Sequence, residues 1–240
     1  MYGFLIALQF LTRLPVHTAT PSPRQTAESH YFYPFVGLLI GLAAVLLRRT
    51  LTSLFPISFS MTLVLAFLIW ITGGLHEDGL ADVADAMGGG WTRDERLQIM
   101  KDSRIGAFGA SVLIVVLLAK YAALTSMVPD RLDASILTAQ TLGRWAFLPL
   151  GYFNRHAREG LGSEFTKMIS AEALGAGTLL SIAAAILLCR VRGAVSFACA
   201  LAVVVLASGY FRRRIGGVTG DCFGAVFHFV EITTYAVYLA

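Results

Sequence analysis

Residues 194–211 of the chain read AVSFACALAVVVLASGYF, and the triplet Arg212-Arg213-Arg214 follows directly. No charged residue interrupts this stretch. A helix needs about 20 predominantly apolar residues to cross the hydrocarbon core of a bilayer. The stretch therefore predicts a membrane-spanning helix that ends in a cluster of positive charge.

The composition of the whole chain agrees with this prediction. Of 240 residues, 56% are hydrophobic and 14% are charged, and the mean hydropathy is +0.69. Soluble domains carry roughly 25% charged residues. Cys189, Cys199 and Cys222 form no CxxC pair and are interpreted as small core residues. The composition excludes a cytosolic globule, a disordered chain and a disulfide-rich secreted domain.

Six further apolar stretches have lengths suited to a bilayer, at residues 31–47, 57–73, 106–127, 134–152, 174–189 and 222–239. Together they predict an all-α, polytopic integral membrane helical bundle with about seven transmembrane helices, within a range of six to eight. Residues 1–12 are apolar but too short to cross, and no small-residue cleavage site follows them, so a surface helix is expected there. We expect a single membrane-embedded catalytic domain over residues 1–240.

The charges of the loops predict the orientation. Alternating the seven spans places residues 1–30, 74–105, 153–173 and 212–221 on one side, with twelve Lys and Arg residues against five on the other. The positive-inside rule assigns the first side to the cytoplasm. The net charge of +4 then reflects cytoplasmic loops, and no nucleic-acid partner is expected. The lipid bilayer is an expected partner, and the oligomeric state, a homo-oligomer included, stays open.

The most acidic part of the chain lies in the predicted cytoplasmic segment 74–105. Residues 73–90 read GGLHEDGLADVADAMGGG, and in a helix Asp78, Asp82 and Asp85 fall at i, i+4 and i+7 on one stripe. Like charges on such a stripe destabilise an empty helix. Carboxylate oxygens suit Mg²⁺, Mn²⁺ or Ca²⁺, which would remove this repulsion. The alternative is a solvated acidic face, which would seldom interleave acids with Gly, Ala and Leu.

Other polar residues near the stripe are candidates for chemistry. His76, Glu77 and, further along the chain, Asp221 are candidate general bases. Lys101 and Arg104 lie three residues apart before an apolar span, which suits a phosphate clamp or a snorkelling position, and Arg96 is a further candidate for binding phosphate. Asp94 and Glu95 are interpreted as ordinary first-turn acids of a short amphipathic helix.

A second polar cluster lies near the C-terminus. The glycine-rich turn through Thr219 and Gly220 leads to Asp221 at the start of a helix, where exposed N–H groups favour phosphate. Asp221, His228 and Glu231 fall on one face of that helix, and ionisable residues in an apolar span mark function or a buried partner. Asp221 is therefore a fourth candidate metal ligand beside Asp78, Asp82 and Asp85.

These features predict a polytopic membrane enzyme that uses carboxylate-bound Mg²⁺ on a phosphorylated substrate. The expected chemistry is attack of an alcohol on a phosphoanhydride. A cation-coupled transporter is the alternative class, but its acids would lie mid-membrane in broken helices, often within two repeated halves.

The acidic segment 73–90, followed by KDSRIGAFG at 101–109, resembles the signature of the cobalamin synthase family. The resemblance extends to LQFLTRLPV at 8–16, YFYPFVGLLIG at 31–41, GRW at 143–145 and GGVTGDCFGA at 216–225, and so covers almost the whole chain. The pattern around Asp78, Asp82 and Asp85 also resembles the CDP-alcohol phosphotransferases, but it lacks their arginine after the alanine and their later aspartate pair.

The resemblance implies transfer of the cobinamide phosphate of adenosylcobinamide-GDP to α-ribazole or its 5′-phosphate, with release of GMP and formation of adenosylcobalamin or its 5′-phosphate. It also implies a Mg²⁺-dependent, multi-pass enzyme of the bacterial cytoplasmic (inner) membrane. The loop charges place both polar clusters on the cytoplasmic side, so an active site that faces the cytoplasm is expected. In this scheme the four aspartates bind Mg²⁺, with Asp82 the most sensitive catalytic position. Lys101 and Arg104 hold phosphate oxygens.

Overall fold

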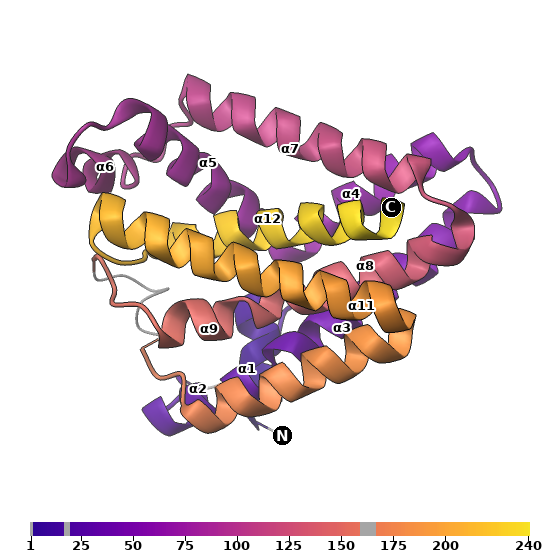
Figure 1. The fold of residues 1–240 in the computed structure, drawn as a ribbon, viewed down its shortest axis with the longest axis horizontal. Coiled ribbons are helices and arrows are strands. Elements are labelled where there is room, and N and C mark those ends of the chain that lie inside the picture. The colour runs from indigo at the N-terminus through magenta and orange to yellow at the C-terminus, as the bar shows by residue number, and fades with distance from the viewer. Residues whose placement is uncertain (1, 17–19, 159–166) are drawn as a thin grey trace.

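The computed structural model describes residues 2–16, 20–158 and 167–240, and every regular element within them is a helix. Figure 1 shows α7, α12 and the two limbs of α11 lying along the long axis of the molecule. The elements in chain order are α1 (Tyr2–Leu11), α2 (Pro23–Ser29), the 3-10 turn η1 (His30–Phe32), α3 (Tyr33–Thr52), α4 (Ile57–Thr72), α5 (Leu75–Gly89), α6 (Arg93–Ile99), α7 (Ala107–Ser126), α8 (Pro129–Trp145), α9 (Phe147–Tyr152), α11 (Ala171–Ile215) and α12 (Gly220–Leu239).

Helix α11 is a hairpin of two antiparallel limbs rather than one long rod (Figure 1). Its backbone leaves helical geometry at Cys189 and Arg190, and Arg190 has φ of 21°. The limbs, residues 171–188 and 191–215, correspond to the apolar stretches predicted at 174–189 and 194–211. The break at Cys189 and Arg190 thus lies between the two apolar stretches that the sequence predicts as separate helices.

Helices α4 and α5 meet at a sharp break. Gly73 and Gly74 connect them with φ of 69° and 73°, a left-handed conformation that residues with a side chain rarely adopt. The chain turns by 88° between the two helices. The break separates an apolar helix from the helix that carries the predicted acidic stripe.

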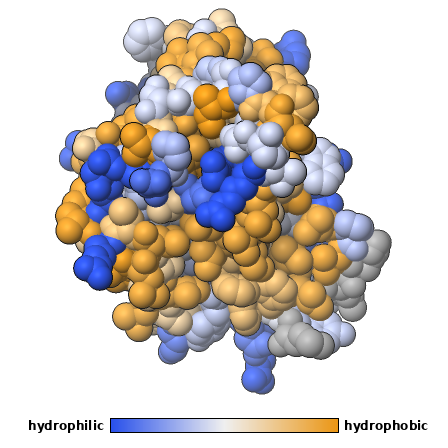
Figure 2. All heavy atoms as spheres, turned by 90° about the vertical axis from the view of Figure 1, so that its right-hand side faces the viewer, coloured by the Kyte–Doolittle hydropathy of each residue, from blue (hydrophilic) through white to orange (hydrophobic). Residues whose placement is uncertain are grey.

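Four helical segments are long and apolar enough to cross a membrane, and a fifth is added if α4 and α5 form one bent span. The four are Pro23–Thr52, Ala107–Ser126, Ala171–Ile215 and Gly220–Leu239. The all-α membrane bundle is confirmed, whereas the number seven stays a prediction. Hydrophobic atoms also cover much of the end of the bundle seen in Figure 2, with hydrophilic side chains gathered across its middle.

Helix α12 lies inside the bundle and packs against α5, α7, α8 and α11. Its contact with α5 is a backbone contact, because each helix places a glycine at the crossing. A Cβ atom on Gly79 would lie 2.8 Å from the carbonyl oxygen of Asp221, and one on Gly224 would lie 2.7 Å from that of His76. The crossing therefore brings the acidic helix against the start of α12.

Replacing Gly224 by alanine should destabilise the protein, because the new methyl group has no room beside the α5 backbone. Overpacking of this kind costs about 1–3 kcal/mol. The free energy of unfolding in detergent micelles measures the loss. Gly175→Ala is the matched control, since nothing lies within 4 Å of a Cβ added there. Equal stabilities of the two variants would contradict the close crossing.

Candidate active site

The structure brings the four predicted metal-ligand aspartates together. We call Asp78, Asp82, Asp85 and Asp221 the acidic cluster. Asp78 is exposed, and the other three are partly buried. The negative charges of Asp221, Asp78 and Asp85 all act on Asp82, so Asp82 is at the electrostatic centre of the cluster. The stripe on α5 and the start of α12 thus form one site, although 135 residues of sequence lie between Asp85 and Asp221.

Asp221 is held in place by two neighbours. Its Oδ2 atom accepts a hydrogen bond from the Thr219 hydroxyl and one from the Arg158 guanidinium, each at 3.0 Å. Arg158 also donates to the carbonyl oxygen of Met100 at 3.2 Å. In the sequence, Arg158 is one of the twelve positive residues of the predicted cytoplasmic loops, and no spacing signal links it to Asp221. Thr219 is buried, whereas Gly220 at the N-terminus of α12 is exposed.

Asp85 has a structural task within the cluster. Its two carboxylate oxygens accept hydrogen bonds from the backbone N–H groups of Gly106 and Gly109, at 2.7 and 2.8 Å. These are groups at the start of α7 that the helix itself leaves unpaired. Asp85 therefore caps α7 and fixes it to α5, a role that spacing along α5 alone does not indicate.

The predicted phosphate-binding cations differ in their surroundings. Arg104 donates to both carboxylate oxygens of Asp102, at 3.0 and 2.7 Å, and these bonds lower the pKa of Asp102 to about 2. Arg96 is buried and donates to the carbonyl oxygen of Arg214 at 3.2 Å. Arg96 thus ties α6 to the end of α11. Lys101 is exposed, and its ammonium group makes no hydrogen bond or ion pair with the described residues.

The short helix expected after the acidic segment is α6. Thr92 and Glu95 form a capping box at its start, in which each side chain accepts a hydrogen bond from the backbone of the other residue. Hydrogen bonds from the N–H groups of Thr92 and Trp91 lower the pKa of Glu95. Among the residues that the structure describes, Asp94 pairs only with Arg93, at 3.4 Å on the surface. Asp94 is therefore the cleaner control position of the two first-turn acids.

A second group of ionisable residues lies inside the bundle, and we call it the buried polar network. Lys120 on α7 donates to Glu231 and contacts the Nδ1 atom of His228, both on α12. Glu231 also accepts hydrogen bonds from Gln140 on α8 and from the Tyr235 hydroxyl. The network satisfies charges that would otherwise be costly inside a membrane.

The candidate bases His76 and Glu77 lie on the inner face of α5, toward this network rather than with the aspartates. His76 is 2% exposed, and its ring lies 4.3 Å from that of Phe227. A Glu77 oxygen lies 3.6 Å from the Nε2 atom of His228. His228 and Glu231, expected to share a face with Asp221, also belong here. Each residue of a helix turns by about 100°, so adjacent positions on α5 point to different environments.

A small enclosed cavity adjoins the network, with room for about one water molecule. The cavity is lined by apolar side chains and by the polar residues Thr72, His76, Glu77, Lys120, Gln140, Arg144 and Glu231. Arg144 is fully buried, and its Nε and NH2 atoms have no hydrogen-bond partner among the described residues. A water molecule in the cavity would supply such a partner.

Among residues 2–16, 20–158 and 167–240, no group of three or more His, Cys, Asp and Glu side chains is arranged to hold a metal ion by itself. The acidic cluster nevertheless supplies the hard oxygen donors that Mg²⁺ prefers. Mg²⁺ commonly binds through one or two carboxylates together with water and substrate phosphates. The donor set therefore fits an ion whose remaining ligands come from a phosphorylated substrate.

Asp85→Ala should lower the stability of the protein without any metal present, because two N–H groups of α7 lose their acceptor. The loss should be about 1–2 kcal/mol, as for a helix N-cap, in unfolding experiments with a chelator present. Asp78→Ala removes an exposed carboxylate from the same stripe and should change stability little. A stability loss for Asp78→Ala as large as that for Asp85→Ala would refute the capping role.

Lys120→Met should destabilise the protein by about 3–5 kcal/mol, because it leaves the buried Glu231 carboxylate without its cation. The double variant Lys120→Met/Glu231→Gln carries neither charge and should recover part of this loss. The free energy of unfolding in detergent micelles is measured for Lys120→Met, Glu231→Gln and the double variant. A double variant that loses the sum of the two single effects would show that the charges are not coupled.

Comparison with known proteins identifies the family. A model of the family described as "Cobalamin-5-phosphate synthase" matches residues 3–239. A protein of Pseudomonas putida named "Adenosylcobinamide-GDP ribazoletransferase" is 39% identical, over 97% of this chain and 96% of its own length. Proteins with the same name from Vibrio cholerae and Shewanella frigidimarina are 37% and 34% identical over 99% of this chain, and 93% and 94% of their own lengths.

No solved structure matches the chain. The family match and the relatives extend over almost every residue, including the acidic cluster and the buried polar network. They confirm the predicted resemblance. The chain belongs to the cobalamin-5-phosphate synthase family.

Proposed function

We propose that the protein transfers the cobinamide phosphate of adenosylcobinamide-GDP to α-ribazole or to its 5′-phosphate, and that Mg²⁺ is required. The products are adenosylcobalamin or its 5′-phosphate, and GMP. The name that the relatives share supports the reaction type. The observation that carries the proposal for this chain is the convergence of α5 and α12 on the acidic cluster.

In the proposed site, Asp82 together with Asp78 or Asp221 would hold Mg²⁺ through one or two carboxylates, and the substrate phosphates would complete the ligand set, while Asp85 orients α7. When bound, the ion neutralises negative charge on the diphosphate of the donor. Arg158 and Thr219 fix the Asp221 carboxylate, which limits the movement of one ligand when substrate enters. The residues of this chain thus supply oxygen donors of fixed position on two helices.

The remaining phosphate oxygens need donors of hydrogen bonds. Lys101 is exposed and not committed to another described residue, and the Gly220 N–H group lies at the N-terminus of α12, where helices favour anions. Arg104 reaches the substrate only if its pairing with Asp102 opens. We therefore assign the first phosphate contact to Lys101. Arg96 instead holds α6 against the end of α11 through its hydrogen bond to the Arg214 carbonyl oxygen.

In the transfer step, the oxygen of a ribose hydroxyl attacks the phosphorus atom that is linked to cobinamide. A new P–O bond forms, and the bond from this phosphorus to the bridging oxygen of the diphosphate breaks, which releases GMP. The hydroxyl proton passes to a carboxylate of the acidic cluster. His76 and Glu77 are less suitable acceptors than the cluster, because they lie with the buried polar network.

The predicted position of the site is the cytoplasmic side of a bacterial inner membrane. The acidic cluster lies near the end of α11 that carries Arg212, Arg213 and Arg214, and positive residues favour the cytoplasmic side. A cytoplasmic opening would give soluble α-ribazole phosphate direct access. The donor, and the acceptor in its 5′-phosphate form, are charged and would reach the site from the aqueous side.

One feature favours the transporter alternative: α4 and α5 form the kind of broken helix that transporters use. A Mg²⁺-dependent exchange with a CDP-linked alcohol is the other alternative. The relatives' shared name and their near-complete coverage of the chain support the ribazole transfer over both.

The direct test follows GMP release from adenosylcobinamide-GDP and α-ribazole 5′-phosphate by the purified protein in lipid, with and without Mg²⁺. Asp82→Asn removes the central charge of the acidic cluster and should reduce turnover by at least 10²-fold, the scale expected for one electrostatic contact to the transition state.

Asp94→Asn is the matched control, since Asp94 is exposed on α6, and it should keep turnover near that of the original protein. Near-normal, Mg²⁺-dependent turnover by Asp82→Asn would overturn the assignment of the acidic cluster. Turnover with a CDP-linked alcohol in place of the GDP donor would favour the other transferase family.

A further inference from the structure

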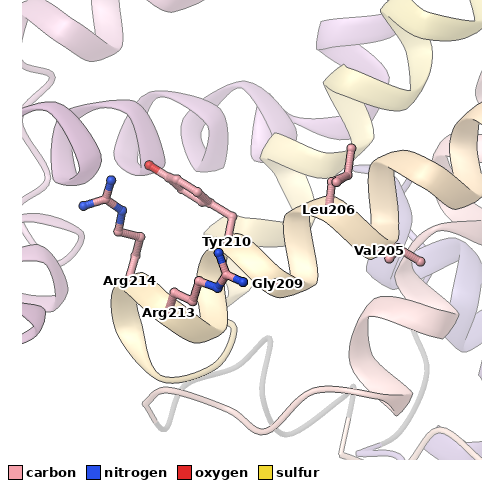
Figure 3. A pocket seen from close by; sticks show the side chains of 6 residues that line it. All are labelled: Val205, Leu206, Gly209, Tyr210, Arg213 and Arg214. Atoms are coloured by element: carbon pink, nitrogen blue, oxygen red, sulfur yellow. The ribbon is translucent and has the colours of Figure 1, made fainter.

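A shallow groove runs along the outer face of the second limb of α11, and none of the aspartates of the acidic cluster lines it. Figure 3 shows its lining: Val205, Leu206, Gly209, Tyr210, Arg213 and Arg214. All six residues come from this one limb, so the groove faces the surroundings of the bundle. It belongs neither to the acidic cluster nor to the buried polar network.

The first half of the groove is apolar. The exposed fractions of Val205 and Leu206 are 60% and 73%, values that are costly in water but ordinary for a surface in lipid. Gly209 forms a notch between them and the arginines, and nothing lies within 4 Å of a Cβ atom added there. The notch leaves space for a chain of methylene groups beside the helix.

The other half is cationic. Arg213 and Arg214 are exposed, and the Arg214 guanidinium lies 5.5 Å from the centre of the Tyr210 ring. The Arg213 guanidinium makes no hydrogen bond or ion pair with any part of the chain that the structure describes. Arg212 differs, because its Nε atom donates to the Ser208 carbonyl oxygen on the same helix, at 3.2 Å. Two adjacent guanidinium groups are therefore presented at the groove.

The spacing of the two halves fits an amphiphile. Val205 and Arg213 are eight residues apart, which is about 12 Å along a helix. An acyl chain beside Val205 and Leu206 would place an anionic headgroup at the level of the arginines. Arginine binds phosphate oxygens in a bidentate manner, and basic sites beside membrane helices favour anionic lipids.

A second copy of the chain fits the groove less well. Copies in one membrane share a two-fold axis along the membrane normal, so a contact through this face would bring each arginine cluster to the level of the other. Like charges placed opposite each other oppose such a contact. The geometry points to a binding site for an anionic phospholipid on α11, with the phosphate at Arg213 and Arg214.

The test places the full chain in nanodiscs of equimolar phosphatidylglycerol and phosphatidylcholine. The protein is then released from the nanodiscs, and native mass spectrometry identifies the lipids that stay bound to it. The original protein should retain phosphatidylglycerol in preference to phosphatidylcholine. Arg213→Gln/Arg214→Gln should lower this preference on the order of tenfold, because two phosphate contacts are lost.

Two further variants separate the parts of the site. Arg212→Gln removes one charge of the same triplet from outside the groove and should keep most of the preference. Gly209→Leu keeps both arginines but fills the notch, and it should lower retention of phosphatidylglycerol. In the original protein, soluble glycerol phosphate should not displace the bound phosphatidylglycerol. Unchanged thermal unfolding confirms that each variant is folded, as expected for exposed positions.

Three results would overturn the proposal. The first is a double variant that retains phosphatidylglycerol as the original protein does. The second is an equal loss with Arg212→Gln, which would indicate a diffuse charge effect. The third is release as a dimer that Gly209→Leu converts to a monomer, which would assign the face to a second copy.

Discussion

The contact on which the site depends is the backbone crossing of α5 and α12. Gly79 and Gly224 let the two helices approach so closely that a single methyl group on either would collide with the other backbone. This crossing places Asp221 beside an acidic stripe that begins far away in the sequence. It also turns the inner face of α5 toward α7 and α8. One contact thus sorts the polar residues of α5 into an acidic cluster and a buried polar network.

The buried polar network explains how such a short, polar helix stays inside an apolar bundle. Helix α5 is bent away from α4 by 88°, and besides its buried apolar residues it carries Glu77 on the side that faces the network. Three contacts connect α5, α7, α8 and α12. They are the ion pair of Lys120 with Glu231, the hydrogen bond from Gln140 to Glu231, and the approach of His228 to Glu77. Removal of one charge therefore weakens the scaffold rather than the chemistry directly.

Much of the fold could be predicted from the sequence, because apolar length and loop charge are local signals. The two limbs of α11, the helix over the acidic segment and the four clustered aspartates all follow from them. Three other features depend on how the helices are rotated and packed. They are the capping of α7 by Asp85, the position of His76 away from the aspartates, and the ion pair of Arg158 with Asp221. Spacing along one helix carries no information on these tertiary contacts.

The measurement that tests the central claim most directly is binding of Mn²⁺, as a paramagnetic substitute for Mg²⁺, followed by the loss of the free-ion electron paramagnetic resonance signal. The acidic cluster supplies an incomplete set of ligands, so adenosylcobinamide-GDP should tighten Mn²⁺ binding at least tenfold in the original protein and not in Asp82→Asn. Mn²⁺ affinity that does not change with the donor, or that Asp82→Asn leaves intact, would contradict the account.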